Sequence, residues 1–122
     1  MTVPVNRGEV RTIMLSLPDR TPTGANPPGI VQKEKRVVLL QTSGSNLTDV
    51  SVVVCDSLKN SRPMRPYEVL VGVREGFDRE TVINCRWVFT VQKRHLRMPT
   101  QRPLSPGVMN QISAALTVGL QL

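Results

Sequence analysis

The first clear pattern in this chain is a strict alternation of apolar and polar positions near its beginning. In residues 9–17, Ile13, Leu15 and Leu17 recur at every second position. A period of two places these side chains on one face of an extended strand. The pattern predicts a half-buried β-strand over residues 9–17.

The next stretch, residues 18–35, has no periodicity. It holds four prolines, two glycines and many polar residues. Such a composition favours turns and irregular backbone. We expect a long, mobile loop here, and loops of this length in compact domains often bind ligands.

Four further apolar stretches predict strands. Residues 37–40, which follow Arg36, are apolar without a break, which indicates burial on both faces. A turn cluster at 43–46 leads into a returning strand at 50–55, so the two form a hairpin. A basic polar loop at 57–65 follows. Strands are then expected at 67–71 and, after a turn at Gly76, over 81–91 as one long or bent strand.

The pattern changes to a helical period at the end of the chain. Ser105 is suited to cap a helix whose first residue is Pro106. The apolar or small residues that follow at helical spacing are Val108, Met109, Ile112, Ala115, Leu116 and Gly119. About five strands and one amphipathic helix predict a single domain over residues 1–122, a small barrel whose open edge the helix covers.

The charge adds a candidate partner to this picture. The formal net charge is +7 and the sequence pI is near 10.5. A small domain of this charge attracts nucleic acids or acidic proteins, although a solvated basic surface is the plainer interpretation. No apolar run of 18 residues is present and residues 1–17 lack the pattern of a signal peptide, so we expect a cytoplasmic protein without a membrane span.

Metal and thiol chemistry find little support in the sequence. Cys55 and Cys85 each lie in an apolar run, which is typical of reduced, buried thiols. Two cysteines and the single histidine, His95, are too scattered for a zinc site, and the carboxylates show no paired spacing for a two-metal nuclease. His95 is a conventional candidate for a general base, but a surface histidine in a basic turn is the favoured interpretation.

Arg36 and Ser57 are the candidates for phosphate chemistry. Arginine offers a planar fork that matches two phosphate oxygens. If residues 37–40 and 50–55 form a hairpin, Arg36 and Ser57 both flank its open end and become neighbours. The plainer interpretations are a charge at the start of a strand and a turn residue that bonds to local backbone.

An ordered set of segments resembles the MazF/PemK family of toxin endoribonucleases. The set covers nearly the whole chain, although no single segment is specific. In order along the chain, these segments are 7–10, 36–40, 52–57, 66–69, 76–77, 81–85, 93–96, 104–105, 109–110 and 114–116.

The resemblance implies an SH3-like barrel of the MazF/CcdB/Kid type. It implies a homodimer that binds single-stranded RNA in a groove across the dimer and cuts it without metal or cofactor. The products of such a cut are a 2′,3′-cyclic phosphate and a free 5′-hydroxyl. It also implies a toxin–antitoxin system, with an acidic antitoxin as partner and DNA binding by the toxin together with that antitoxin.

The same resemblance assigns roles to residues of this chain. The essential arginine of the family falls on Arg36, and the Thr or Ser of the third strand falls on Ser57. Arginine is a poor base because it stays protonated, so Arg36 is not assigned to deprotonate the 2′-hydroxyl. We assign Arg36 mainly to charge stabilisation and to protonation of the leaving group, and Ser57 to orienting the phosphate. The basic residues expected to contact RNA are Lys35, Lys59, Arg62, Arg65 and Arg86.

This chain departs from the family pattern at several positions. Val37 stands where a proline usually follows the arginine, and the proline usual near the end of the third strand is replaced in the 55–56 region. Arg86 stands where some relatives have an aspartate, and Arg11 where an aromatic residue is common. Two alternative functions therefore stay in view: a barrel that binds RNA without cutting it, and a CcdB-like toxin that acts on a protein such as a topoisomerase.

Overall fold

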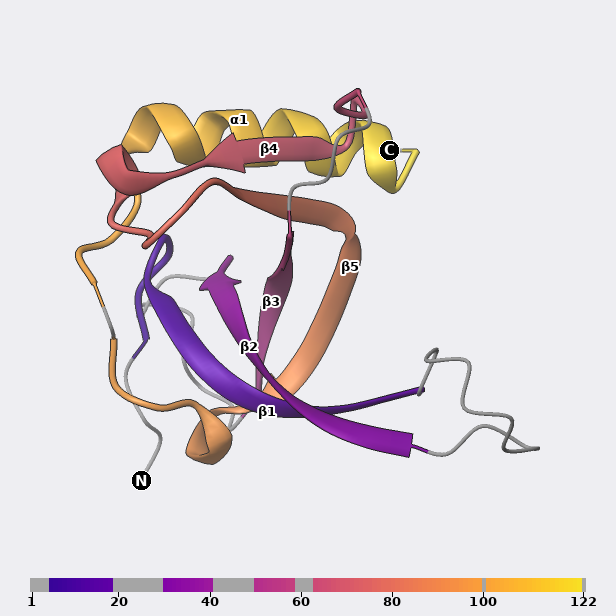
Figure 1. Cartoon of the computed structure of the whole chain (residues 1–122), viewed down its shortest axis with the longest axis vertical. Coiled ribbons are helices and arrows are strands. Elements are labelled where there is room, and N and C mark those ends of the chain that lie inside the picture. The colour runs from indigo at the N-terminus through magenta and orange to yellow at the C-terminus, as the bar shows by residue number, and fades with distance from the viewer. Residues whose placement is uncertain (1–4, 19–29, 41–49, 59–62, 100, 122) are drawn as a thin grey trace.

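The computed structural model describes residues 5–18, 30–40, 50–58, 63–99 and 101–121. These residues form five strands, two short 3-10 helices and one α-helix (Figure 1). In chain order, the elements are β1 (Val10–Pro18), β2 (Ile30–Leu39), β3 (Val50–Leu58), β4 (Glu68–Val71), η2 (Val73–Glu75), β5 (Thr81–Gln92), η3 (Lys93–His95) and α1 (Pro106–Gly119).

The strands form one antiparallel sheet in the order β1-β2-β3-β5-β4, which curls strongly (Figure 1). Among the described strands, β1 and β4 are the two edges and do not pair, so the sheet is an open barrel. The curl is sharpest in β5, because the register with β3 changes from Val54–Val88 to Cys55–Asn84. Residues 85–87 therefore lack partners on β3, and an extra loop of backbone of this kind bends a strand.

The free edge of β1 is bordered by the segment that leads to α1. The amide of Arg97 donates a 3.0 Å hydrogen bond to the carbonyl of Thr12, and the amide of Leu104 donates one of 2.9 Å to the carbonyl of Gly8. Backbone groups at a sheet edge need partners. The bond to Thr12 supplies one for β1, and the bond to Gly8 ties down the chain just before β1.

Strand β2 contributes to two apolar clusters, one on each face. Val38 packs in a cluster with Phe77 and Ile112, whereas Val37 and Leu39 pack in a second cluster on the opposite face. All three β2 residues are buried, and burial of such side chains stabilises a fold by about 1.5–3 kcal/mol each. The predicted burial on both faces is confirmed.

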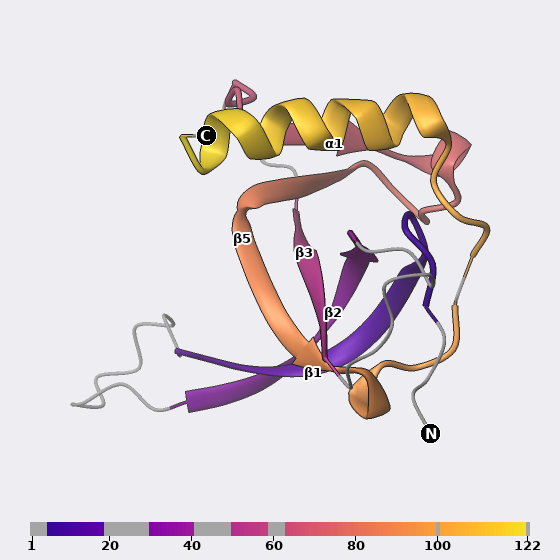
Figure 2. The same ribbon diagram turned by 180° about the vertical axis from the view of Figure 1, so that it is seen from behind.

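The C-terminal helix forms as predicted. Ser105 Oγ accepts a 3.3 Å hydrogen bond from the amide of Val108, with Pro106 as the first helical residue. Met109, Ile112 and Ala115 are its buried side chains. Seen from behind, α1 lies along β4 and above the first half of β5 (Figure 2). The prediction of a mainly β fold with one C-terminal helix is confirmed. No helix in the described part of the chain is long and apolar enough to cross a membrane.

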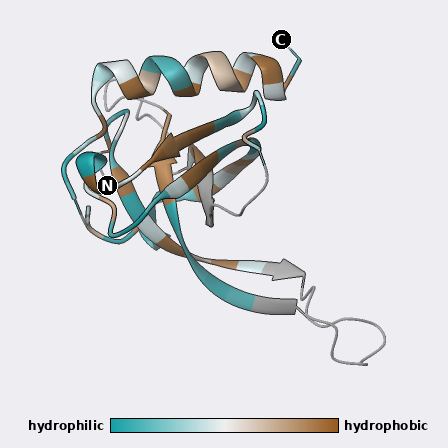
Figure 3. Ribbon diagram, turned by 45° about the horizontal axis from the view of Figure 1, so that its top comes forward, coloured by the Kyte–Doolittle hydropathy of each residue, from teal (hydrophilic) through white to brown (hydrophobic). Residues whose placement is uncertain are grey.

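The prediction of one loop over residues 18–35 is wrong for its second half. Ile30 begins β2, and β2 pairs with β1 along its length, so that Lys35 lies opposite Ile13 and Lys33 opposite Leu15. Gln32, Lys33 and Glu34 are exposed, and the ribbon extends away from the body of the molecule (Figure 3). A strand without a buried face shows no apolar alternation, so backbone pairing alone defines it. Residues 19–29 of the predicted loop lie outside the described residues.

The expected end of the third strand is also wrong. Strand β3 continues to Leu58, and Ser57 lies opposite Val82 of β5. Ser57 is therefore a strand residue and not a turn residue. The polar loop expected over 57–65 follows Leu58, and its residues Lys59 and Arg62 lie outside the part of the chain that the structure describes.

Candidate functional site

Arg36 lies inside β2, opposite Thr12 of β1, and does not open the strand as the sequence indicated. The β2–β3 ladder ends at the pair Val37–Cys55. Arg36 precedes Val37 by one residue, and Ser57 follows Cys55 by two. The backbones of both candidates therefore lie at the same end of this ladder.

The side chain of Arg36 reaches across to the turn between η2 and β5. Its Nη2 donates a 3.0 Å hydrogen bond to Asp78 Oδ1, and its guanidinium carbon lies 5.2 Å from the centre of the Phe77 ring. The Arg36 side chain is 28% exposed and that of Asp78 is 70% exposed. The Arg36 guanidinium thus contacts both the Phe77 ring and the Asp78 carboxylate, and it is still partly exposed to solvent.

The backbone that carries Phe77 and Asp78 is fixed from several sides. Phe77 is buried, and its amide donates to the carbonyl of Gly72 at 3.1 Å. Gly76 has a φ of +100°, which favours glycine. Gln101 Nε2 donates a 2.7 Å hydrogen bond to the carbonyl of Glu75. The turn that contacts Arg36 is therefore held by the core and by the segment before α1.

The electrostatics of the pair follow from this contact. The hydrogen bond from Arg36, together with its positive charge, lowers the pKa of the Asp78 carboxyl below its ordinary value. Asp78 is ionised near neutral pH in any case, and the lowered pKa extends its ionisation to more acidic solutions. Arg36 is therefore a cation with a counter-charge, the Asp78 carboxylate, at its Nη2 group.

A second basic cluster surrounds Tyr67, directly before β4. Arg65 Nη1 donates a 2.9 Å hydrogen bond to the Tyr67 hydroxyl, and the guanidinium carbon of Arg86 lies 5.1 Å from the centre of the same ring. The hydrogen bond from Arg65 is the main cause that lowers the pKa of Tyr67, and Arg86 acts in the same direction. Arg65 and Arg86 are both exposed. Arg65 and Arg86, which were both predicted to contact RNA, thus both contact Tyr67.

Lys35 belongs to neither cluster. It lies next to Arg36 in β2, opposite Ile13, and is half-buried. Successive side chains of a strand point to opposite faces, so Lys35 and Arg36 do not share a surface.

His95 and Cys85 do not add a base or a nucleophile to these clusters. His95 is exposed at the end of η3. The amide of Cys85, next to Arg86, donates a 2.9 Å hydrogen bond to the carbonyl of Tyr67. Cys85 is buried, and burial raises the pKa of its thiol to about 11. A thiol with such a pKa is protonated and inert near neutral pH. No three His, Cys, Asp or Glu side chains of the described ranges come together as a metal site would require.

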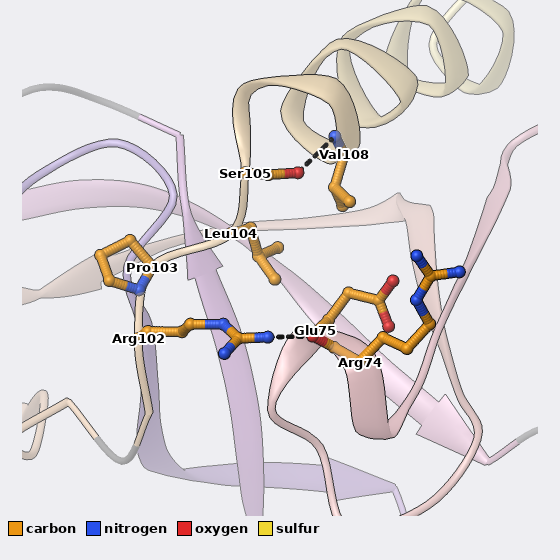
Figure 4. Close-up of a pocket in the computed structure, with 7 residues that line it drawn as sticks. All are labelled: Arg74, Glu75, Arg102, Pro103, Leu104, Ser105 and Val108. Atoms are coloured by element: carbon orange, nitrogen blue, oxygen red, sulfur yellow. Dashed lines mark hydrogen bonds between the residues drawn. The ribbon is translucent and has the colours of Figure 1, made fainter.

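A pocket of about 330 Å³ lies between η2 and the first turn of α1 (Figure 4). Arg102 reaches across it and donates a hydrogen bond to the carbonyl of Arg74. The pocket is lined by Arg74, Glu75, Arg102, Pro103, Leu104, Ser105 and Val108. It borders the same η2 turn that leads to Phe77 and Asp78.

Sequence reasoning did not assign Phe77, Asp78 or Tyr67 to a site. Arg36 and Asp78 are 42 residues apart in the chain, and no local spacing connects them. The only local signal is the glycine turn at Gly76 followed directly by an aromatic and an acidic residue. Such a signal marks a turn but does not name the arginine that it meets.

Several solved structures share this fold. The chain is similar to an endoribonuclease from a mycobacterial species, solved with its cognate antitoxin: TM-score 0.68, 22% identity, 97% of this chain and 96% of the other covered. It is similar to MazF in a MazE–MazF complex from Deinococcus radiodurans, with a TM-score of 0.69, 13% identity and 98% of each chain covered.

A third similar structure is the toxin MazF-mt6 of Mycobacterium tuberculosis. The TM-score is 0.65, the identity 16%, and the match covers 74% of this chain and 89% of the other. No family model and no curated protein matches the sequence. At these identities the likeness establishes a shared MazF-like fold along nearly the whole chain.

Proposed function

We propose that this chain is the toxin of a toxin–antitoxin system and a metal-independent endoribonuclease for single-stranded RNA. The observation that carries the proposal is the environment of Arg36: a partly exposed guanidinium in contact with Phe77 and Asp78. It is supported by the full-length likeness of the fold to a solved endoribonuclease. The formal net charge of +7 suits a polyanionic substrate.

In the proposed reaction, the 2′-hydroxyl of one nucleotide attacks the adjacent phosphorus. A 2′-O–P bond forms, the P–O5′ bond breaks, and the products are a 2′,3′-cyclic phosphate and a 5′-hydroxyl. The 2′-hydroxyl loses its proton to water and the departing O5′ gains one. Arg36 stabilises the charge of the phosphorane and passes a proton to O5′, which it regains from water, while Ser57 hydrogen-bonds and orients the phosphate.

The proposal includes the contacts that bring RNA to this site. Arg65 and Arg86, which meet on Tyr67, contribute positive charge for backbone phosphates. Lys35, Lys59 and Arg62 stay predictions of the same kind. The toxin forms a homodimer in the cytoplasm, and an acidic antitoxin occupies the RNA groove of that dimer.

One experiment separates this proposal from its alternatives. The purified chain is incubated with long single-stranded RNA in excess chelator, and the products are examined for cyclic phosphate ends. Cleavage with such ends supports the endoribonuclease. Retention of intact RNA indicates a binding barrel, and indifference to RNA indicates a toxin directed at a protein; either result contradicts the proposal.

A further inference from the structure

Fixing the Arg36 side chain in one orientation costs more conformational entropy than for most side chains, because arginine carries about 2 kcal/mol of rotamer entropy. A guanidinium that must meet a phosphorane works best when its orientation is fixed before the substrate arrives. Groups that fix the guanidinium of Arg36 in the free protein would therefore favour the proposed reaction.

Two adjacent residues of one turn constrain this guanidinium in complementary ways. The Phe77 ring, with its centre 5.2 Å from the guanidinium carbon, restricts the position of the group. The Asp78 carboxylate, 3.0 Å from Nη2, restricts its rotation. Phe77 is only 2% exposed and therefore belongs to the core. The contact is thus made from a rigid side of the molecule.

We propose that Asp78 is a positioning residue for Arg36, with Phe77 as the surface on which the guanidinium rests. The inference rests on the proposed function, since it concerns the readiness of Arg36 for a phosphate. Asp78 contacts the guanidinium at Nη2; a guanidinium has five N–H donors, so this one contact does not exclude a phosphate oxygen from the group. A competing interpretation is that Asp78 occupies the phosphate position and blocks it.

Asp78→Asn tests the proposal because it keeps the size of the side chain and removes its charge. The matched control is Glu34→Gln. Glu34 lies two residues before Arg36 on the same face of β2 and forms an exposed ion pair with Arg97 at 3.4 Å. Both variants change the net charge equally, so their general attraction to RNA changes equally.

The readouts are the single-turnover cleavage rate and the dissociation constant for an RNA with a 2′-deoxy group at the scissile nucleotide. We expect Asp78→Asn to cleave about tenfold more slowly than Glu34→Gln, with dissociation constants within about twofold of each other. Asp78→Glu should recover part of the rate. In an Arg36→Ala background, Asp78→Asn should have no further effect, because a positioning residue acts only through its partner.

Three outcomes would overturn the proposal. The first is that Asp78→Asn cleaves as fast as Glu34→Gln. The second is that Asp78→Asn binds the uncleavable RNA more tightly while its cleavage is undiminished, which indicates that Asp78 blocks the phosphate position. The third is an equal loss of rate with and without Arg36. Circular dichroism of each variant excludes a loss of fold.

A second measurement keeps this inference separate from the proposed function. The order parameter of the Arg36 Nε–Hε group, measured by NMR in the free protein, should fall in Asp78→Asn and not in Glu34→Gln. If the wild-type chain cuts no RNA, the proposed function fails while this measurement still decides the positioning. An unchanged order parameter in Asp78→Asn overturns the positioning role whatever the activity.

Discussion

The guanidinium of Arg86, at the bend of β5, lies over the ring of Tyr67, the residue directly before β4. Arg65 donates a hydrogen bond to the hydroxyl of the same tyrosine. The two arginines favour the phenolate over the phenol, so the pKa of Tyr67 is lowered from its ordinary value of 10.0. This relationship is measurable, because Tyr67 is the single tyrosine of the chain.

Tyr67 should ionise below pH 10, as followed by its absorbance near 295 nm. Arg65→Ala should move the titration back towards the ordinary value, and Arg86→Ala should do so to a smaller degree, because Arg65 is the larger cause. A titration identical in the wild type and in both variants would contradict the cluster.

The lowered pKa of Tyr67 also determines whether folding stability rises or falls with pH. Between the lowered pKa and the ordinary one, the unfolded chain holds the Tyr67 proton while the folded chain has released it, so stability rises with pH in that window. The contribution is fully present above the ordinary pKa and is lost as the pH falls through the folded value.

Replacing Arg36 should remove RNA cleavage while leaving the fold intact. Loss of the cation costs on the order of 3 kcal/mol of transition-state stabilisation, about a hundredfold in rate. Arg36→Lys should recover only part, because an ammonium group cannot form the two-pronged contact. Ser57→Ala should lose about 1–2 kcal/mol, one hydrogen bond to phosphate. Single-turnover rates test the series, and wild-type cleavage by a folded Arg36→Ala protein would reject the site.

Gly119→Ala should destabilise the fold. A Cβ at Gly119 would meet the Cβ of Tyr67 at 3.0 Å and the carbonyl oxygen of Cys85 at 3.1 Å. Overpacking of this kind costs about 1–3 kcal/mol of unfolding free energy. Gly107→Ala in the same helix is the control, since its Cβ would meet Ser105 Oγ at 3.9 Å. It should be neutral or add about 0.5–1 kcal/mol. Equal denaturation midpoints for the two variants would contradict this account of the packing.

The chain should be a homodimer at micromolar concentration. Leu70 of β4 is 42% exposed, and Val118 and Leu120, in the last turn of α1 and directly after it, are 52% and 44% exposed. A symmetric partner would bury apolar groups of this kind. Light scattering measures the mass directly. A monomeric mass would argue against both the dimer and a groove shared between two protomers.

An acidic antitoxin peptide should associate rapidly and with strong salt dependence. The basic surface of the chain steers an oppositely charged partner, an effect that falls as ionic strength rises. Association rates of a peptide rich in Asp and Glu, measured at low and at physiological salt, should decrease severalfold. A rate that does not change with salt would leave charge complementarity without a role in this interaction.

Several elements could be predicted from local sequence because local chemistry defines them. Ser105 and Pro106 start the helix with a cap and a fixed φ, and Met109, Ile112 and Ala115 fall on one face. Ile13 marks β1 by alternation. Each signal depends on residues that are close in the chain, so a single sequence contains it.

Strand pairing and the surroundings of Arg36 were decided only by the tertiary structure. Lys33 and Glu34 carry no strand signal, and they are strand residues because β1 supplies backbone partners. The core places Phe77, and with it Asp78, against an arginine 42 residues away. The sequence by itself determined which arginine is the candidate. The packing of the η2–β5 turn on the core decided what holds it, because contacts between distant segments leave no periodic trace in the chain.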